Sequence, residues 1–169
     1  RGPDEEGFYF SRHGVLGHRR LSIIDIQNGK QPMNFMYQGN TYVIVYNGQI
    51  YNTNEIRGEL LKAGFTFKGH SDTEVLLKAY IHYGYDVCKH LNGIFGFAVW
   101  NVGKEELFVA RDMFGIKPFY YTIKNGNFIF ASEIKAILEY PDCEAILDSQ
   151  GICELFGVGP SHTPRTYSV

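Results

Sequence analysis

The sequence predicts a layered α/β or α+β domain in which two β-sheets pack together and are flanked by helices. Three observations predict it: short apolar runs separated by turn signals, two amphipathic helical segments, and a second half made mostly of hairpins. Strands that are continuously apolar are covered on both faces, so each sheet needs a layer on either side. A plain alternation of strands and helices fits the hairpin-rich second half less well.

The predicted strands follow the apolar runs of the sequence. These runs cover residues 8–10, 42–46, 94–100, 107–110, 119–123 and 128–131. The last two are joined by Lys124-Asn125-Gly126-Asn127, in which Asn-Gly readily adopts the positive φ angles of a two-residue hairpin turn. We therefore expect a hairpin there.

Two segments have the capping residues and apolar periodicity of helices. One covers residues 53–63 and stops at Gly64, and the other begins at residues 71–74 and ends at Gly84. The predicted capping pairs are Asn52 with Glu55, and Ser71 with Glu74, whose carboxylate is expected to reach back to the helix start.

Composition excludes several classes of protein. A net charge of −2 over 169 residues, with scattered Lys and Arg, argues against a nucleic-acid binder. The apolar runs are too short to span a bilayer, and the N-terminus lacks the pattern of a signal peptide. Three cysteines without a CxxC pair, and histidines without metal-binding spacing, predict no disulfide framework and no metal site. A cytoplasmic protein fits these features best.

The sharpest local motif is Asn47-Gly48, which follows the apolar run 42–46. If the strand ends there, the Asn47 amide and the Gly48 N–H point at one spot, and two rigid donors form an oxyanion hole. From the residues alone, a hairpin turn is the commoner meaning of Asn-Gly.

Charged residues and cysteines offer further candidates. Arg19 or Arg20 projects from an apolar segment and has the fork geometry that grips a carboxylate, although two strand-edge surface arginines are the commoner arrangement. Asp72 has the charge to receive an ammonium group, but it is equally explained as an acid favoured by the helix dipole. Cys88 and Cys153 lie in apolar stretches, which favours core packing over nucleophilic roles.

The order of the motifs resembles the N-terminal glutaminase domain of asparagine synthetases, a class II glutamine amidotransferase domain. The match covers nearly the whole chain. The resembling segments are Arg1-Gly2-Pro3-Asp4, residues 17–25 (GHRRLSIID), Gln31-Pro32-Met33, residues 46–52 (YNGQIYN), 71–74 (SDTE), 93–98 (GIFGFA), 110–121 (ARDMFGIKPFYY) and 131–136 (ASEIKA). The resemblance implies an amidotransferase domain over residues 1–157, with 158–169 beginning the connection to a synthetase domain.

The resemblance also implies a fold and an activity. The fold is an α+β N-terminal-nucleophile hydrolase, a four-layer αββα sandwich of two stacked, mainly antiparallel sheets. In the family an N-terminal cysteine thiolate attacks the glutamine amide, and its own α-amino group moves the proton. Ammonia then passes to the synthetase domain of the same polypeptide, where ATP and Mg²⁺ support amidation of aspartate. No cofactor is expected in the glutaminase domain itself, and a homodimer is compatible with the family.

The resemblance assigns roles to individual residues. Arg20 is expected to bind the α-carboxylate of glutamine in a pocket lined by Leu21, Ser22, Ile23 and Ile24. Asn47 and Gly48 are expected to hold the oxyanion, and Asp72 the α-ammonium group. Gln49 stands where the family usually has Glu, which predicts modestly weaker glutamine binding. The remaining motif residues, expected to be scaffold or interdomain contacts, are Arg111, Asp112, Lys117, Glu133 and Lys135.

One departure concerns the nucleophile. The sequence begins at Arg1, and none of its cysteines carries a free α-amino group, so this polypeptide is expected not to hydrolyse glutamine and to be truncated at both ends. Two alternatives remain. One is the glutaminase domain of another class II enzyme, such as glucosamine-6-phosphate synthase or the phosphoribosyl-pyrophosphate amidotransferase. The other is a non-catalytic glutamine-binding or assembly module.

Overall fold

The structure, a computed structural model, describes residues 2, 5–20, 29–147, 149, 153, 156 and 167–168; for Arg20, Leu147, Tyr167 and Ser168 it describes only the backbone. The chain forms two compact units, residues 1–117 and 118–169. Every strand pair among the described residues is antiparallel. The expected domain boundary at residue 157 stays a prediction.

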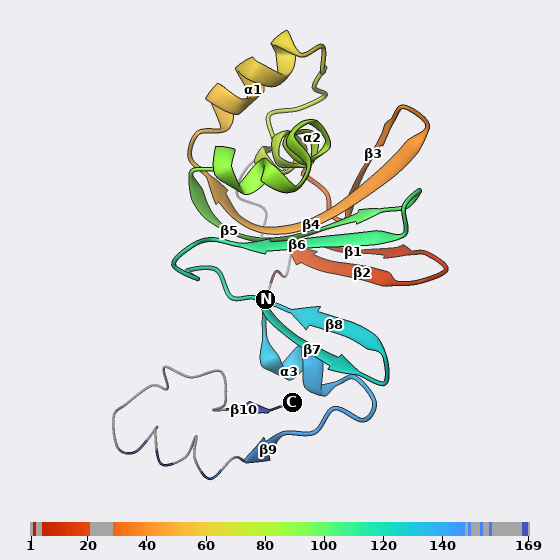
Figure 1. The fold of residues 1–169 in the computed structure, drawn as a ribbon, viewed down its shortest axis with the longest axis vertical. Coiled ribbons are helices and arrows are strands. Elements are labelled where there is room, and N and C mark those ends of the chain that lie inside the picture. The colour runs from red at the N-terminus through yellow and green to blue at the C-terminus, as the bar shows by residue number, and fades with distance from the viewer. Residues whose placement is uncertain are drawn as a thin grey trace. The chain divides into compact units, whose positions relative to one another are not determined.

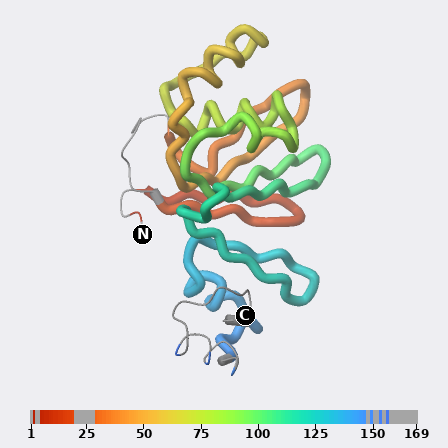
Figure 2. Tube along the Cα trace, turned by 60° about the vertical axis from the view of Figure 1, so that its left-hand side comes forward, coloured from red at the N-terminus to blue at the C-terminus, as the bar shows by residue number. Residues whose placement is uncertain are grey.

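The first unit is built on a four-stranded sheet in the order β3-β4-β5-β6. Figures 1 and 2 show helices on one face of this sheet and the β1–β2 hairpin on the other. The elements are β1 (Glu5–Phe10), β2 (Val15–Arg20), β3 (Met33–Tyr37), β4 (Asn40–Ile50), α1 (Thr53–Lys62), α2 (Asp72–Tyr83), η1 (Gly84–His90), β5 (Gly93–Asn101) and β6 (Glu106–Arg111).

The central strands of this sheet are buried on both faces. Val43 and Ile44, consecutive residues whose side chains point to opposite faces, are both fully buried, and so are Ala98 and Val99 of β5. Ile44 and Val99 belong to the core cluster beneath the helices, together with Leu60 of α1. The prediction that the apolar runs are strands covered on both faces is confirmed for β4 and β5.

The first helix lies where the sequence predicts it, but its capping pair is wrong. Asn52 occupies the N-cap position without making a side-chain cap. Its amide instead donates to the His90 carbonyl oxygen at 2.9 Å and accepts from the Asn92 N–H at 2.9 Å. Asn52 therefore ties the end of β4 to the connection that enters β5, a long-range contact that the local pattern does not show.

The second helix is capped by Ser71, whose hydroxyl accepts from the Thr73 N–H at 3.2 Å. Glu74 does not reach back to Ser71, so the predicted reciprocal bond is wrong. Its carboxylate accepts from the N–H groups of Lys68 and Gly69 and pairs with Lys78, one turn further along the helix. The buried ammonium group of Lys78 attracts the carboxylate more strongly than a neutral N–H group does.

The second unit begins with the predicted hairpin. Its strands are β7 (Tyr120–Lys124) and β8 (Asn127–Ala131), and the turn residues Asn125 and Gly126 have φ angles of 51° and 77°. Positive φ at both positions is what a type I′ turn requires, so the prediction is confirmed. The unit also contains α3 (Ile134–Leu138), β9 (Ile146–Leu147) and β10 (Tyr167–Ser168). Within the described part of the whole chain, no helix is long and apolar enough to cross a membrane.

Candidate functional site

Asn47 and Gly48 lie inside strand β4, three and two residues before its last residue, Ile50. Asn47 pairs with Gly96 and Gly48 with Phe95 of β5, and the pairing continues to Ile50. Both readings of Asn-Gly from the sequence, the end of a strand and a hairpin turn, are therefore wrong. Extensive pairing with β5, whose residues lie 43 to 59 positions away in sequence from their partners in β4, overrides the local turn preference.

Gly48 is required by the close approach of the β5 backbone. A Cβ atom at this position would lie 2.3 Å from the Ile94 carbonyl oxygen and 2.8 Å from the Phe95 Cα. Gly93, opposite Ile50, is in the same situation against the Gln49 carbonyl oxygen, at 2.3 Å. The two strands therefore lie in close contact from Gly48, which belongs to the motif that supplies the candidate oxyanion donors, to the end of β4.

Gly48→Ala is expected to lower the free energy of unfolding by about 1–3 kcal/mol, because the added methyl group displaces β5. Gly58→Ala is the matched control: it lies in helix α1, where an added Cβ meets no atom within 4 Å. Alanine is the better helix former, so this variant is expected to gain up to ~1 kcal/mol. Urea unfolding of both variants measures the difference, and equal midpoints would contradict the close approach.

Tyr46 connects this strand to the start of helix α2. Its hydroxyl group donates to the Asp72 carboxylate at 2.9 Å. Burial, and then the neighbouring Asp72 charge, raise the pKa of Tyr46 far above its usual range, so the hydroxyl stays neutral and donating. Asp72, in the first turn of α2, is thereby held beside the residue that precedes Asn47.

The main chain of Tyr46 bonds away from β5. Its N–H donates to the Gln31 side-chain oxygen at 2.6 Å, and His18 Nε2 lies 3.1 Å from its carbonyl oxygen. Residues of a central strand bond alternately to the neighbours on either side. The N–H groups of Tyr46 and Gly48 therefore point to the same edge of β4, the edge that faces away from β5. The described β3–β4 pairing along this edge ends earlier, at the Met33–Ile44 pair.

Arg20 is the last residue of β2, and its backbone pairs with Glu5. His18, two residues earlier, contacts Tyr46, so β2 approaches β4 beside the Asn47-Gly48 motif. The Arg20 side chain and the predicted pocket residues Leu21, Ser22, Ile23 and Ile24 lie outside the described residues. Gln49 is described, and its side chain is exposed.

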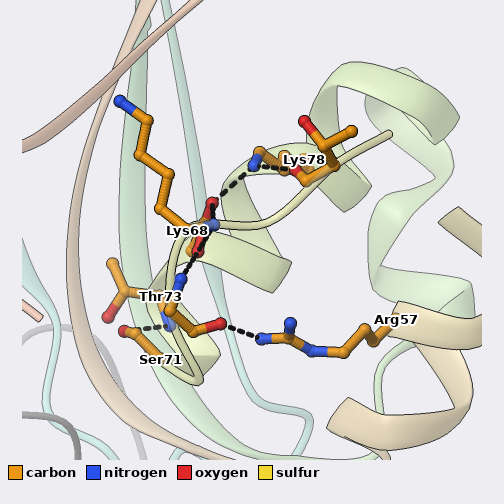
Figure 3. A network of polar contacts seen from close by, with 8 residues as sticks. Arg57, Lys68, Ser71, Thr73 and Lys78 are labelled. Atoms are coloured by element: carbon orange, nitrogen blue, oxygen red, sulfur yellow. Dashed lines mark hydrogen bonds and ion pairs between the residues drawn. The ribbon is translucent and has the colours of Figure 1, made fainter. Parts of the chain in front are cut away.

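A buried ion pair fixes the segment that leads into Asp72. Lys78 is 1% exposed, its Nζ lies 2.5 Å from Glu74 Oε1, and it also donates to the Thr66 carbonyl oxygen. The aromatic rings of Phe35 and Phe67 lie 4.5 and 4.6 Å from the same Nζ. Figure 3 shows the polar contacts of Lys78 and Lys68 together with Arg57, whose guanidinium donates to the Gly69 carbonyl oxygen at 2.7 Å. The start of α2 is therefore held from both sides.

The Glu74–Lys78 pair predicts a loss of stability in acid. Burial works to raise the pKa of Glu74, but the bonds from Lys78, Lys68 and Gly69 outweigh it and lower the pKa below its ordinary value. A lowered folded-state pKa contributes stability above the unfolded-state value, about 4.3, and that contribution is lost as the pH falls through the folded-state pKa. Unfolding of the wild type is therefore expected to become easier as the pH falls below about 5.

The control variants for this acid effect are Glu74→Gln and Glu55→Gln. Glu74→Gln removes the titrating group and is expected to flatten the pH dependence of the unfolding free energy over that range. Glu55, exposed in the first turn of α1, is the control for removing one glutamate carboxylate, and the Glu55→Gln variant is expected to keep the loss of stability in acid that the Glu74–Lys78 pair causes. Parallel pH profiles for wild type and Glu74→Gln would contradict the role of this pair.

The predicted scaffold residues are also placed. The Asp112 carboxylate accepts from the N–H groups of Ile116 and Lys117, at 2.8 and 2.9 Å, and from that of Phe95 at 3.2 Å. The Arg111 guanidinium donates to the carbonyl oxygens of Gly115 and Lys117. These contacts fold residues 112–117 onto the strand that faces Gly48. In the second unit, Lys135 pairs with Glu133 at 2.8 Å.

None of the cysteines pairs in a disulfide. Cys143 is buried, but Cys88 and Cys153 are exposed, so the expectation that they pack in the core is wrong. Cys88 lies in η1, where Val87 supplies the buried residue instead. No group of three or more His, Cys, Asp or Glu side chains is positioned to hold a metal among the residues that the structure describes.

Sequence reasoning did not assign a role to Tyr46 or to the side chain of Gln31. Both lie inside motifs that the resemblance quotes, YNGQIYN and Gln-Pro-Met, which is the signal that points to them. Their partners, Asp72 and Thr73, are 26 and 42 residues away in sequence, so only the fold shows the contacts.

Comparison with known proteins identifies the family. The model of the glutamine amidotransferase domain family matches residues 1–168. The chain belongs to this family. It is 51% identical over 166 residues to asparagine synthetase [glutamine-hydrolyzing] 3 of Bacillus subtilis, covering 98% of this chain and 27% of that protein. It is 49% identical over 138 residues to asparagine synthetase [glutamine-hydrolyzing] 1 of the same organism, covering 82% of this chain and 22% of the relative. The chain thus spans about a quarter of the length of these relatives.

Solved amidotransferase structures share the fold. The glutamine phosphoribosylpyrophosphate amidotransferase of B. subtilis, complexed with ADP and GMP, matches with a TM-score of 0.62 at 25% identity, over 73% of this chain and 28% of that one. This confirms the predicted α+β N-terminal-nucleophile hydrolase fold with antiparallel sheets. The chain is a glutamine amidotransferase domain homologous to the glutaminase domains of asparagine synthetases, and the much lower identity to the phosphoribosyl-pyrophosphate enzyme separates it from that branch.

Proposed function

We propose that this domain hydrolyses glutamine to glutamate and ammonia within a longer asparagine synthetase polypeptide, whose synthetase domain uses the ammonia to amidate aspartate with ATP and Mg²⁺. The names of the relatives and the identity of 51% over 98% of the chain support the proposal. The observation that carries it is the Tyr46–Asp72 hydrogen bond, because it brings the candidate ammonium-binding group to the strand of the candidate oxyanion donors.

Each group has a distinct role in binding glutamine. The Asp72 carboxylate receives the α-ammonium group, and Arg20 receives the α-carboxylate beside Leu21, Ser22, Ile23 and Ile24. The side-chain carbonyl oxygen of glutamine lies between the Asn47 amide and the Gly48 N–H. The β4–β5 ladder fixes the backbone that carries both neutral donors, so little reorganisation is needed when the oxygen becomes charged.

The reaction then follows from an N-terminal cysteine encoded before Arg1. Its thiolate attacks the amide carbon, and the C=O electron pair moves to the oxygen held by Asn47 and Gly48. The cysteine's α-amino group, which has taken the proton of the thiol, passes it to the amide nitrogen; the C–N bond breaks, and ammonia leaves as the thioester forms. Water hydrolyses the thioester to glutamate and regenerates the thiol.

Free cysteines in this chain fit a cytoplasmic protein, and a homodimer stays a prediction.

Gln49→Glu is expected to lower the KM for glutamine by a factor of about two to five, because a carboxylate adds attraction for the α-ammonium group at an exposed position. The measurement is the rate of glutamate release over a range of glutamine concentrations. The kcat should stay unchanged, since no oxyanion donor is altered. An unchanged KM would show that residue 49 does not sense the ammonium group.

The proposed function is tested by reading the coding sequence before Arg1 and assaying the full-length protein. A cysteine codon directly after the initiator codon is expected, and the purified protein should release glutamate from glutamine. Replacement of that cysteine by alanine should abolish release while synthesis of asparagine from added ammonium chloride continues. A full-length protein without this cysteine, or without glutamate release, would contradict the proposal and favour a non-catalytic module.

A further inference from the structure

We propose that Gln31 is a positioning residue of the glutamine site: its side-chain amide fixes the strand that carries Asn47 and Gly48 against the helix start that carries Asp72. This inference rests on the proposed function. Gln31 belongs to the Gln-Pro-Met motif of the sequence and is not one of the groups proposed to contact glutamine.

The Gln31 side chain takes the place of a neighbouring strand. Beyond the Met33–Ile44 pair, the β3–β4 register would next bring residue 31 opposite Tyr46 on the same side of β4. There the side-chain amide bonds both main-chain groups of Tyr46: Oε1 accepts from the N–H at 2.6 Å, and Nε2 donates to the carbonyl oxygen at 3.1 Å. A primary amide offers the same donor and acceptor pair as a peptide group, so it continues the ladder where the backbone of β3 does not.

The same Nε2 reaches the start of helix α2. It lies 3.4 Å from the Thr73 hydroxyl oxygen, a long hydrogen bond. Thr73 directly follows Asp72 and is 3% exposed, so water does not readily replace the contact. One side chain therefore touches the residue before Asn47 and the residue after Asp72.

The backbone of Gln31 is held by the β1–β2 hairpin. A Cβ at Gly7 of β1 would lie 2.3 Å from the Gln31 carbonyl oxygen and 3.1 Å from Pro32 Cδ, so strand β1 and the Gln31-Pro32 segment are in direct contact. Gly7 pairs with His18, whose ring also contacts the Tyr46 carbonyl oxygen. The Gln31 backbone is thus fixed by β1, and its side-chain amide positions β4 and the start of α2 through hydrogen bonds.

Removal of the amide is expected to change catalysis more than folding. The Tyr46 N–H would lose its partner, the Tyr46 carbonyl oxygen would keep only its contact with His18, and β4 would be free to shift relative to α2. A misplacement of about 1 Å at a site that aligns reacting groups lowers the rate by up to 100-fold. Displaced oxyanion donors lower kcat, and a displaced Asp72 raises KM, so both constants should change.

The test compares Gln31→Leu and Gln31→Glu with the wild-type full-length protein in glutamate release. Gln31→Leu keeps the bulk of the side chain without its polar atoms, and kcat/KM is expected to fall about 10- to 100-fold, through both constants. Gln31→Glu keeps an acceptor for the Tyr46 N–H but no longer donates to Tyr46 and Thr73, and a comparable loss is expected. Should Gln31→Leu not fold, Gln31→Glu decides the question by the same criterion.

Two control variants separate positioning from stability. Gln38→Asn changes an exposed glutamine at the far end of the β3–β4 hairpin and should leave kcat and KM unchanged. Ile56→Val removes a methyl group from the core, where Ile56 is 2% exposed, and should lower the melting temperature without changing either constant per folded molecule. Folded Gln31 variants with wild-type kcat and KM would overturn the inference about Gln31 but not the proposed function. A wild type that releases no glutamate would overturn the proposed function and the inference with it.

Discussion

Replacing Asn47 by alanine is expected to lower kcat for glutamine hydrolysis by about 100- to 1000-fold, the loss typical of one side-chain donor in an oxyanion hole. The KM for glutamine should change little, because the neutral amide of the substrate gains less from this donor than the charged intermediate does. Strand β4 should stay intact, since its pairing with β5 uses main-chain groups. The measurement is steady-state glutamate release by the full-length protein.

Asn34→Ala is the control for this prediction. Asn34 lies on the neighbouring strand β3, is exposed, and pairs with Val43 only through the backbone ladder. Its replacement should leave kcat unchanged. A kcat for Asn47→Ala within about threefold of the wild type would remove Asn47 from the oxyanion hole, since it corresponds to less than one ordinary hydrogen bond.

Asp72→Asn is expected to raise the KM for glutamine by about 10- to 100-fold, the value of a hydrogen bond to a charged partner. Asparagine keeps an oxygen that accepts from the Tyr46 hydroxyl, so the local structure is preserved while the negative charge is lost. Because the α-ammonium group keeps its charge throughout the reaction, kcat should change much less than KM. Kinetics of glutamate release over a wide glutamine range measure both constants.

The matched control for the charge is Asp86→Asn in η1. Asp86 is exposed and pairs with Lys89 at 2.7 Å, so its replacement changes net charge by the same amount away from the site. Glutamine KM should stay at the wild-type value in this variant. If Asp72→Asn behaved like Asp86→Asn, the assignment of Asp72 to the ammonium group would be wrong.

The strands and helices could be predicted because their signals are local. The apolar runs predict burial of β4 and β5 on both faces, and Asn125-Gly126 predicts the β7–β8 turn from backbone preference alone. The extent of β4 could not be predicted in this way. Its last residues, Asn47 to Ile50, are held by pairing with β5, and the local Asn-Gly preference points instead to a turn.

The capping pairs show the same limit. Ser71 caps α2 as the pattern predicts, because the interaction lies within three residues. Glu74 turns to Lys78 and the loop before the helix, since a buried ammonium group is a stronger partner than the N–H of Ser71. Asn52 likewise serves a connection near residue 90.

The candidate site was found through the resemblance, and its internal connections required the fold. Asn47, Gly48 and Asp72 are assigned by motif, whereas Tyr46 and Gln31 acquire their roles only when β4 and α2 lie side by side. Local sequence predicts only a strand residue for a tyrosine before Asn-Gly, and only a loop residue for a glutamine before proline. The hydrogen-bonding roles of Tyr46 and Gln31 cannot be predicted from the spacing of apolar residues, because neither residue is unusual within its own segment.

The most direct measurement is a crystal structure of the full-length protein, with its cysteine replaced by alanine, soaked with glutamine. The α-ammonium nitrogen is expected within about 3 Å of the Asp72 carboxylate, and the side-chain carbonyl oxygen within about 3 Å of both Asn47 Nδ2 and the Gly48 nitrogen. Arg20 should contact the α-carboxylate of the same molecule. Glutamine bound at another place would contradict these roles. So would a glutamine molecule that contacts Asp72 or Asn47 but not both.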